Sequence, residues 1–225
     1  MGTGPVFSRT TLPTRCHPEY RLHFMGMHYG LIAATATRQE FLAELTRHAD
    51  ECEVGPPATP DDEMTIGERN GHTFVLDTSM TLSNEDDMVL EMSERLGTVV
   101  CAGAETVSGT YWITAARDGV PLRCVFVQHA GMTRGMAIGD PLPTEADRPI
   151  EDLDGEGIFA ALTWLGLDAE GWLAEGSSDV LRWSGERNPQ GGQICEIKRT
   201  HYERYKRPDD DNWLSRLTAV VRDEP

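Results

Sequence analysis

The sequence has few basic side chains and no long run of apolar residues. Among its 225 residues, 37 are acidic and 20 are basic, which gives a formal net charge of −17 at pH 7. Because phosphate binding requires a positive face that releases counterions, this balance disfavours nucleic acid and anionic lipid and favours basic partners. No apolar run reaches the roughly 18 residues of a membrane helix, and no signal-peptide core stands near the start. We therefore expect a cytoplasmic protein that does not enter a membrane.

The recurrent motifs of catalysis and cofactor binding are also missing. The chain has no GxxxxGK[ST] loop for nucleotide phosphates, no GxGxxG fingerprint and no GxSxG turn around a nucleophilic serine. Its five cysteines show no CxxC spacing, and we interpret them as reduced thiols. His48 and Cys52 share one helix face, but two ligands do not make a zinc site. The sequence therefore predicts no metal and no cofactor, and it favours a protein that is not an enzyme.

The rest of the composition is that of a folded domain. Hydrophobic residues make up 39% of the chain, which is enough for a sizeable core. We assign residues 25–225 to a single α+β domain with a C-terminal hairpin and a short helix. Residues 1–24 are rich in proline and arginine and show no apolar periodicity, which is typical of a disordered tail. We hypothesise that the native start is Met25 or Met27.

Hydrophobic periodicity predicts an alternation of strands and helices, followed by a β-meander. A buried strand over residues 27–35 precedes a helix whose start is marked by a capping box of Thr37 and Glu40. Residues 53–71 read as a polar loop, and a strand over residues 72–76 leads into a second capped helix. We expect these helices to pack on one face of a mainly antiparallel sheet.

The strongest local signal is Asp118-Gly119, which lies between two alternating runs and predicts a β-hairpin. A two-residue loop there places Ala115 opposite Leu122, and the same register continues along both strands. One face of the hairpin is then apolar throughout. The other face is mixed and carries Arg123.

Residues 130–154 form a long segment rich in glycine, proline and acidic residues, which we interpret as an irregular surface loop. Asp154 and Asp168 are expected to start two helices, because a carboxylate at a helix start accepts backbone N–H groups and offsets the positive end of the dipole. The helices follow the loop directly.

The C-terminal part of the sequence predicts a second hairpin. Residues 180–183 and 193–197 are strand-like, and the turn-rich residues 188–192 lie between them. A short amphipathic helix is expected from about Asn212. Residues 198–207, here called the basic segment, are the only concentrated basic stretch and include two tyrosines. Such a stretch suits single-stranded nucleic acid, but pairing with the domain's own acidic surface is the interpretation we favour.

Three polar residues around the first hairpin are the candidates for catalysis. Glu105 lies at a bend, Arg123 projects from the mixed face and His129 follows the last strand, so that the three could line one pocket. In this hypothesis His129 is the base and Arg123 holds an anionic small-molecule substrate. The alternative is a hairpin with ordinary polar ends.

Clusters of acidic residues are the candidates for binding. The clearest include Asp61, Asp62, Glu63, Asp86 and Asp87, none of which follows a calcium-loop pattern. Such clusters are commonly solvated surface, and Asp86 has a second explanation as a helix start. The alternative interpretation is that these clusters dock a basic protein.

Two functions follow from these observations. The first is a protein-binding or inhibitory module that engages a basic partner; in charge, size and lack of motifs the chain is similar to the small acidic immunity proteins that neutralise bacterial toxins. The second is a small enzyme that uses Glu105, Arg123 and His129. The sequence favours the first and leaves the partner and the oligomeric state open.

Overall fold

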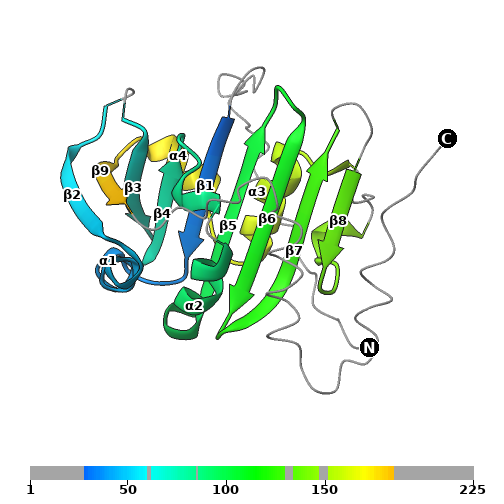
Figure 1. The fold of residues 1–225 in the computed structure, drawn as a ribbon, viewed down its shortest axis with the longest axis horizontal. Coiled ribbons are helices and arrows are strands. Elements are labelled where there is room, and N and C mark those ends of the chain that lie inside the picture. The colour runs from blue at the N-terminus through cyan, green and yellow to red at the C-terminus, as the bar shows by residue number, and fades with distance from the viewer. Residues whose placement is uncertain (1–27, 60–61, 85, 130–133, 147–151, 185–225) are drawn as a thin grey trace, which may run out of the picture.

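The computed structural model describes residues 28–59, 62–84, 86–129, 134–146 and 152–184 (Figure 1). Within them the chain forms one antiparallel sheet of nine strands with helices on both faces. The fold is therefore α+β with a dominant antiparallel sheet, as predicted. No helix in the described part of the chain is long and apolar enough to span a bilayer.

Several sequence predictions fall on residues that lie outside the described part. They are the N-terminal tail, the second strand of the C-terminal hairpin and the helix from Asn212.

The sheet has the strand order β2-β9-β3-β4-β1-β5-β6-β7-β8, with β1 at its centre. Its last described strand, β9, lies between β2 and β3, which are consecutive in the chain. The bounds of the strands are as follows: β1 (His28–Ala34), β2 (Glu51–Pro57), β3 (Met64–Arg69), β4 (His72–Asp77), β5 (Thr98–Glu105), β6 (Thr110–Arg117), β7 (Val120–Gln128), β8 (Arg134–Ile138) and β9 (Asp179–Ser184).

The helices cover both faces of the sheet, so the prediction of one covered face is wrong. Helices α1 (Arg38–Leu45) and α2 (Asp86–Leu96) lie on one face, and α3 (Gly155–Trp164) and α4 (Ala169–Glu175) lie on the other (Figure 1). Three short 3₁₀ helices complete the described elements: η1 (Thr46–His48), η2 (Leu82–Asn84) and η3 (Pro143–Glu145).

The central strands explain why both faces are covered. β1 is buried at every residue after its first, and β5 is buried at every residue before its last. A strand with apolar side chains on both faces needs a layer of helices on each. Ile32 accordingly packs in the core under α1 and α2, whereas Leu31 packs in the core under α3 and α4.

The predicted helix starts are confirmed where they are described. At α1 the hydroxyl of Thr37 accepts the Glu40 N–H, and the Glu40 carboxylate accepts the Thr37 N–H at 2.9 Å. Asp154 accepts the Gly157 N–H at 2.8 Å at the start of α3. Asp168 caps α4 in the same way.

Two predicted loops contain strands that the sequence pattern did not reveal. The polar loop at residues 53–71 contains most of β2 and all of β3, and the irregular segment at residues 130–154 contains β8. β2 ends in two prolines, which lowers its apparent strand propensity. Proline is nevertheless tolerated in β2 because this strand is at the edge of the sheet.

The first hairpin has the predicted turn, but only the part next to the turn has the predicted register. Asp118 and Gly119 both have positive φ, as a two-residue hairpin loop requires. Next to the turn the pairing is as predicted, but a bulge then shifts it by one residue, and Ala115 pairs with Arg123 instead of Leu122. The shift moves Arg123 from the mixed face to the face covered by α3.

Candidate functional site

Arg123 is a buried structural cation. Its side chain is only 5% exposed, and its guanidinium grips Glu145 of η3 with two contacts, one of them an Nε–Oε1 hydrogen bond of 3.0 Å. A further N–H donates to the Gly139 carbonyl at 2.7 Å, and Glu145 also accepts the Leu142 N–H. These bonds fasten the segment after β8 against β7. Arg123 has no free face for a substrate.

Glu105 and His129 lie at the other end of the hairpin. Glu105 is opposite Thr110, which is in turn opposite Gln128, so His129 follows at the same end of the sheet. Arg123 is six residues before His129, about 20 Å along an extended strand. The structure therefore does not bring the three candidate catalytic residues into one pocket.

The local partners of Glu105 and His129 are those of an ordinary strand end. Glu105 accepts a 2.7 Å hydrogen bond from the Ser108 hydroxyl within the bend. The His129 ring meets the edge of Tyr111 with 5.9 Å between ring centroids. This arrangement agrees with the alternative interpretation of polar strand ends.

The structure describes the side chains of only some of the candidate acidic residues. Asp61 lies outside the described residues, as do the side chains of Asp86 and Asp87 at the start of α2. Asp62 and Glu63 precede β3, and both border a cavity of about 500 Å³. We call this cavity the acidic pocket.

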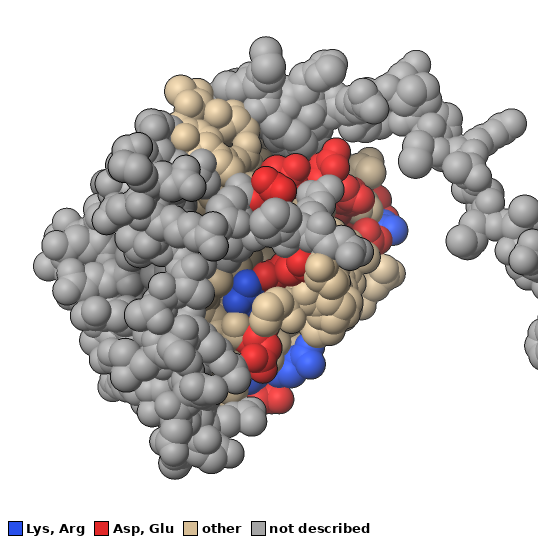
Figure 2. Space-filling view, turned by 90° about the vertical axis from the view of Figure 1, so that its right-hand side faces the viewer, with Lys and Arg blue, Asp and Glu red and all other residues tan. Residues whose placement is uncertain are grey.

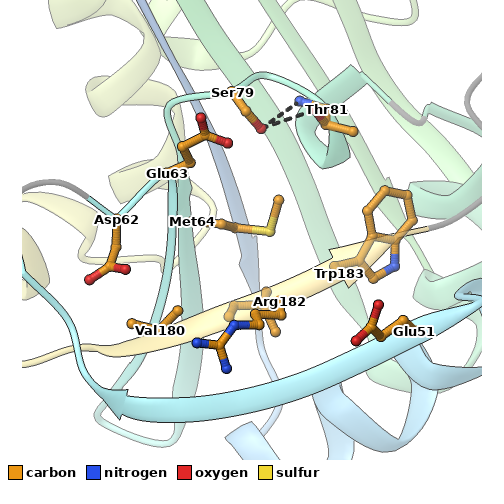
Figure 3. Close-up of a pocket in the computed structure, with 10 residues that line it drawn as sticks. Glu51, Asp62, Glu63, Met64, Ser79, Thr81, Val180, Arg182 and Trp183 are labelled. Atoms are coloured by element: carbon orange, nitrogen blue, oxygen red, sulfur yellow. Dashed lines mark hydrogen bonds between the residues drawn. The ribbon is translucent and has the colours of Figure 1, made fainter.

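The acidic pocket is formed by parts of the chain that are far apart in sequence. Its walls come from the start of β2, the start of β3, the turn after β4 and most of β9 (Figure 3). Met64 lies near the middle of this group of side chains, with Trp183 to one side. The lining residues are Glu51, Asp62, Glu63, Met64, Ser79, Thr81, Val180, Leu181, Arg182 and Trp183.

The pocket exists because β9 parts from β3. β9 pairs with β2 from its first residue to its last, but it pairs with β3 only at Asp179 and Val180. From Leu181 onward no described strand lies on the β3 side of β9. Side chains from the two diverging strands border the resulting gap.

Two backbone hydrogen bonds show which edge of β9 is open. The N–H groups of Asp50 and Ala58 donate to the carbonyls of Ser184 and Ser178, each at 2.8 Å. Alternate residues of a strand turn their peptide groups to the same edge. The peptide groups of Leu181 and Trp183 therefore face away from β2, toward the acidic pocket.

The charges around the pocket are unevenly paired. Asp62 accepts two hydrogen bonds from Thr59, one from the N–H at 2.7 Å and one from the hydroxyl at 2.9 Å, and it also feels the positive charge of Arg182. Glu51 and Glu63 are exposed and have no ion-pair partner among the described residues. Two carboxylates at the border of the pocket are thus without a counterion in the described part of the chain.

Trp183 contributes a buried hydrogen-bond donor without an acceptor. Its indole Nε1 is shielded from solvent and has no partner among the described residues. A buried polar group in this state costs about 1–3 kcal/mol.

Asp62 gives the site a testable pH dependence. The hydrogen bonds from Thr59 lower the pKa of Asp62 below its ordinary value. Because the folded pKa is the lower one, the stabilisation is complete above the ordinary aspartate value of about 3.9 and is lost as the pH falls through the folded pKa. We expect the Thr59 amide to stay protected from hydrogen exchange at pH 4.5 and to lose that protection in stronger acid. Asp62→Asn should abolish this pH step; a step that persists in the variant contradicts the assignment.

Acidic side chains are not confined to the pocket. On the side of the molecule that carries β8, at the opposite end of the sheet, red acidic surface is more extensive than blue basic surface among the described residues (Figure 2). No group of three or more His, Cys, Asp or Glu side chains in the described ranges is arranged to hold a metal ion.

Sequence reasoning found Asp62 and Glu63 but missed most of the pocket. Glu51, Arg182 and Trp183 join it because β9 inserts beside β2, and no local pattern encodes that pairing. The comparisons with known proteins add no further residue, because no family model, curated protein or solved structure matches this chain.

Proposed function

We propose that this protein is a binding module that engages a basic protein, and that the acidic pocket receives a lysine or arginine side chain of that partner. One observation carries the proposal: Glu51 and Glu63 are exposed and unpaired within the described structure at the border of a cavity of about 500 Å³. A volume of this size is in the range of ligand sites.

The lining of the pocket suits a long cationic side chain. The aliphatic stem of lysine or arginine packs well on apolar side chains such as Met64, while the charged head stays near carboxylates. The indole of Trp183 can add attraction between a cation and its ring face. Because Arg182 already lies near Asp62, Glu51 and Glu63 are the carboxylates that remain for the partner.

The charge of the whole chain supports the same proposal at longer range. A net charge of −17 accelerates encounter with a basic surface and makes the association rate sensitive to salt. If the partner's basic surface is its working surface, covering it is inhibitory. The module would then act in the manner of an immunity protein.

The proposal is tested by titrating the full chain with a pentalysine peptide in isothermal calorimetry at low and high salt. We expect binding at low salt that weakens as salt rises. In the double variant Glu51→Gln with Glu63→Gln, affinity should fall about tenfold, which corresponds to the loss of about 1.4 kcal/mol of charged contacts.

A control with the same change in net charge separates the pocket from the general field. Glu53 and Glu170 are exposed and do not line the pocket, so Glu53→Gln with Glu170→Gln should weaken binding far less. Equal losses in the two double variants, or no binding at low salt, would contradict the proposal.

A further inference from the structure

A second cavity, of about 200 Å³, lies between the sheet and the start of α3. Tyr29 of β1 and Tyr111 of β6 both border it, and each is paired with Ala104 of β5, which lies between them. Paired residues on neighbouring strands share a face of the sheet, so the three form one row, with the two tyrosine backbones about 10 Å apart. Alanine is too short to fill the space between the tyrosines. We call this cavity, whose border is completed by Thr106 and residues 154–156, the tyrosine slot.

The start of α3 leaves room above the slot because its first residue, Gly155, has no side chain. A Cβ atom at this position would lie 3.5 Å from the hydroxyl oxygen of Tyr29, which is an ordinary contact distance. Tyr29 is 5% exposed and Ala104 is 1% exposed, so the floor of the slot is shielded from bulk water. The cavity is therefore formed before any ligand enters it.

The charges at the start of α3 disfavour an anion in the slot. Anions often bind to the free N–H groups at a helix start, but here Asp154 already accepts the Gly157 N–H at 2.8 Å. Asp154 and Glu156 bring two negative charges, whereas the helix dipole supplies only about half a positive charge. The local field thus favours a cation.

The ionisation of Tyr29 indicates the same sign of charge. Burial, with further contributions from Tyr111 and Asp154, raises the pKa of Tyr29 above its ordinary value. Burial acts against any charged group, but the carboxylate of Asp154 acts only against another negative charge. A cation in the slot is attracted by the same carboxylate.

The size and the walls of the slot fit a quaternary ammonium ion. At about 30 Å³ for each water-sized group, the cavity holds about seven non-hydrogen atoms, as many as choline has. Tyrosine rings attract such cations to their faces, and nearby carboxylates add to the attraction. A quaternary nitrogen carries no N–H group, so its burial leaves no hydrogen-bond donor without an acceptor, in contrast to a primary amine.

We propose that the tyrosine slot is a binding site for a small quaternary ammonium ion of the size of choline. In this site the cation lies over Ala104, between Tyr29 and Tyr111, with Asp154 and Glu156 beside it. The slot and the acidic pocket have no lining residue in common, so the inference does not depend on the proposed function.

The first test is a titration of the isotope-labelled full chain with choline, followed by NMR. We expect saturable shifts of the amide signals of Ala104 and Gly155. The neutral analogue of choline, in which carbon replaces the quaternary nitrogen, has the same shape and should bind at least fivefold more weakly. Equal affinity of the two compounds overturns the inference, as does an absence of saturable shifts. Shifts centred on Met64 and Val180 also overturn it, because they would place choline in the acidic pocket.

A second test fills the slot from the side of α3. Gly155→Leu should abolish choline binding, because the added side chain starts beside Tyr29, and leucine is well accepted in a helix. Ala160→Leu is the matched control, since it puts the same side chain at an exposed position of the same helix and should leave choline binding unchanged. Unchanged affinity in Gly155→Leu overturns the inference.

A third test changes one wall of the slot and stands even if Gly155→Leu fails to fold. Tyr111→Phe keeps the aromatic ring and should bind choline within about twofold of the unaltered chain, whereas Tyr111→Leu removes the ring and should weaken binding about tenfold. Equal affinities of these two variants would show that the ring does not hold the cation and would overturn the inference.

Discussion

Replacing Trp172 with alanine should lower the free energy of unfolding by about 3–5 kcal/mol, the range for deleting a large buried aromatic side chain. Trp172 is 2% exposed and stacks on Phe74 of β4, with 5.4 Å between the ring centroids. It is the largest buried side chain of α4 and belongs to the core between this helix and the sheet. The loss leaves a cavity that the rigid strands cannot fill.

Urea unfolding followed by tryptophan fluorescence and circular dichroism measures this loss. Trp164 offers a matched control, because it is the same residue type at the end of the neighbouring helix α3 but is 49% exposed. Trp164→Ala should change the free energy of unfolding by less than about 1 kcal/mol, as surface substitutions usually do. Similar losses in the two variants would show that α4 is not anchored as described.

The second large effect is expected at the buried ion pair. Arg123→Ala should cost about 3–5 kcal/mol, because it leaves the Glu145 carboxylate without its cation in a partly buried site. The same substitution also removes the donor to the Gly139 carbonyl. Replacing both partners, as Arg123→Met with Glu145→Leu, should recover a large part of the loss, since no lone charge then remains.

An exposed ion pair provides the comparison for Arg123. Arg38 contacts Asp179 at 2.6 Å, but both side chains are about one-third exposed. Arg38→Ala should therefore cost only about 0–1 kcal/mol in the same urea experiment. An Arg123→Ala variant as stable as Arg38→Ala would refute the structural role of the buried pair. Normal stability of Arg123→Ala would mean that the ion pair with Glu145 does not explain why this cation is buried.

The sequence was a good guide to local structure and a poor guide to long-range pairing. The capping box of Thr37 and Glu40 and the turn at Asp118-Gly119 were predictable because their physics is contained in a few neighbouring residues. The bulge beside Ala115 was not, since alternation alone does not show where a strand takes in an extra residue. Because of this extra residue, Arg123 lies on the face covered by α3 and not on the mixed face.

The site was harder to predict than the fold. Asp62 and Glu63 were visible as an acidic cluster, but the cavity that they border arises from the insertion of β9 between β2 and β3. Such an insertion depends on which distant segments pair, and many pairings satisfy the same hydrophobic pattern. Trp183 in particular reads as an ordinary strand residue until its neighbours are known.

The position of β9 also has a consequence for how the protein is made. β2 belongs to the early part of the chain, yet among the described strands it pairs only with β9, the last of them to leave the ribosome. During synthesis the backbone N–H and C=O groups of β2 therefore have no strand partner until β9 has been made. Unpaired strands are the ones most open to unwanted pairing with other chains. Pro56 and Pro57 at its end protect the nascent chain in that interval, because they withhold the N–H groups that a foreign strand would use.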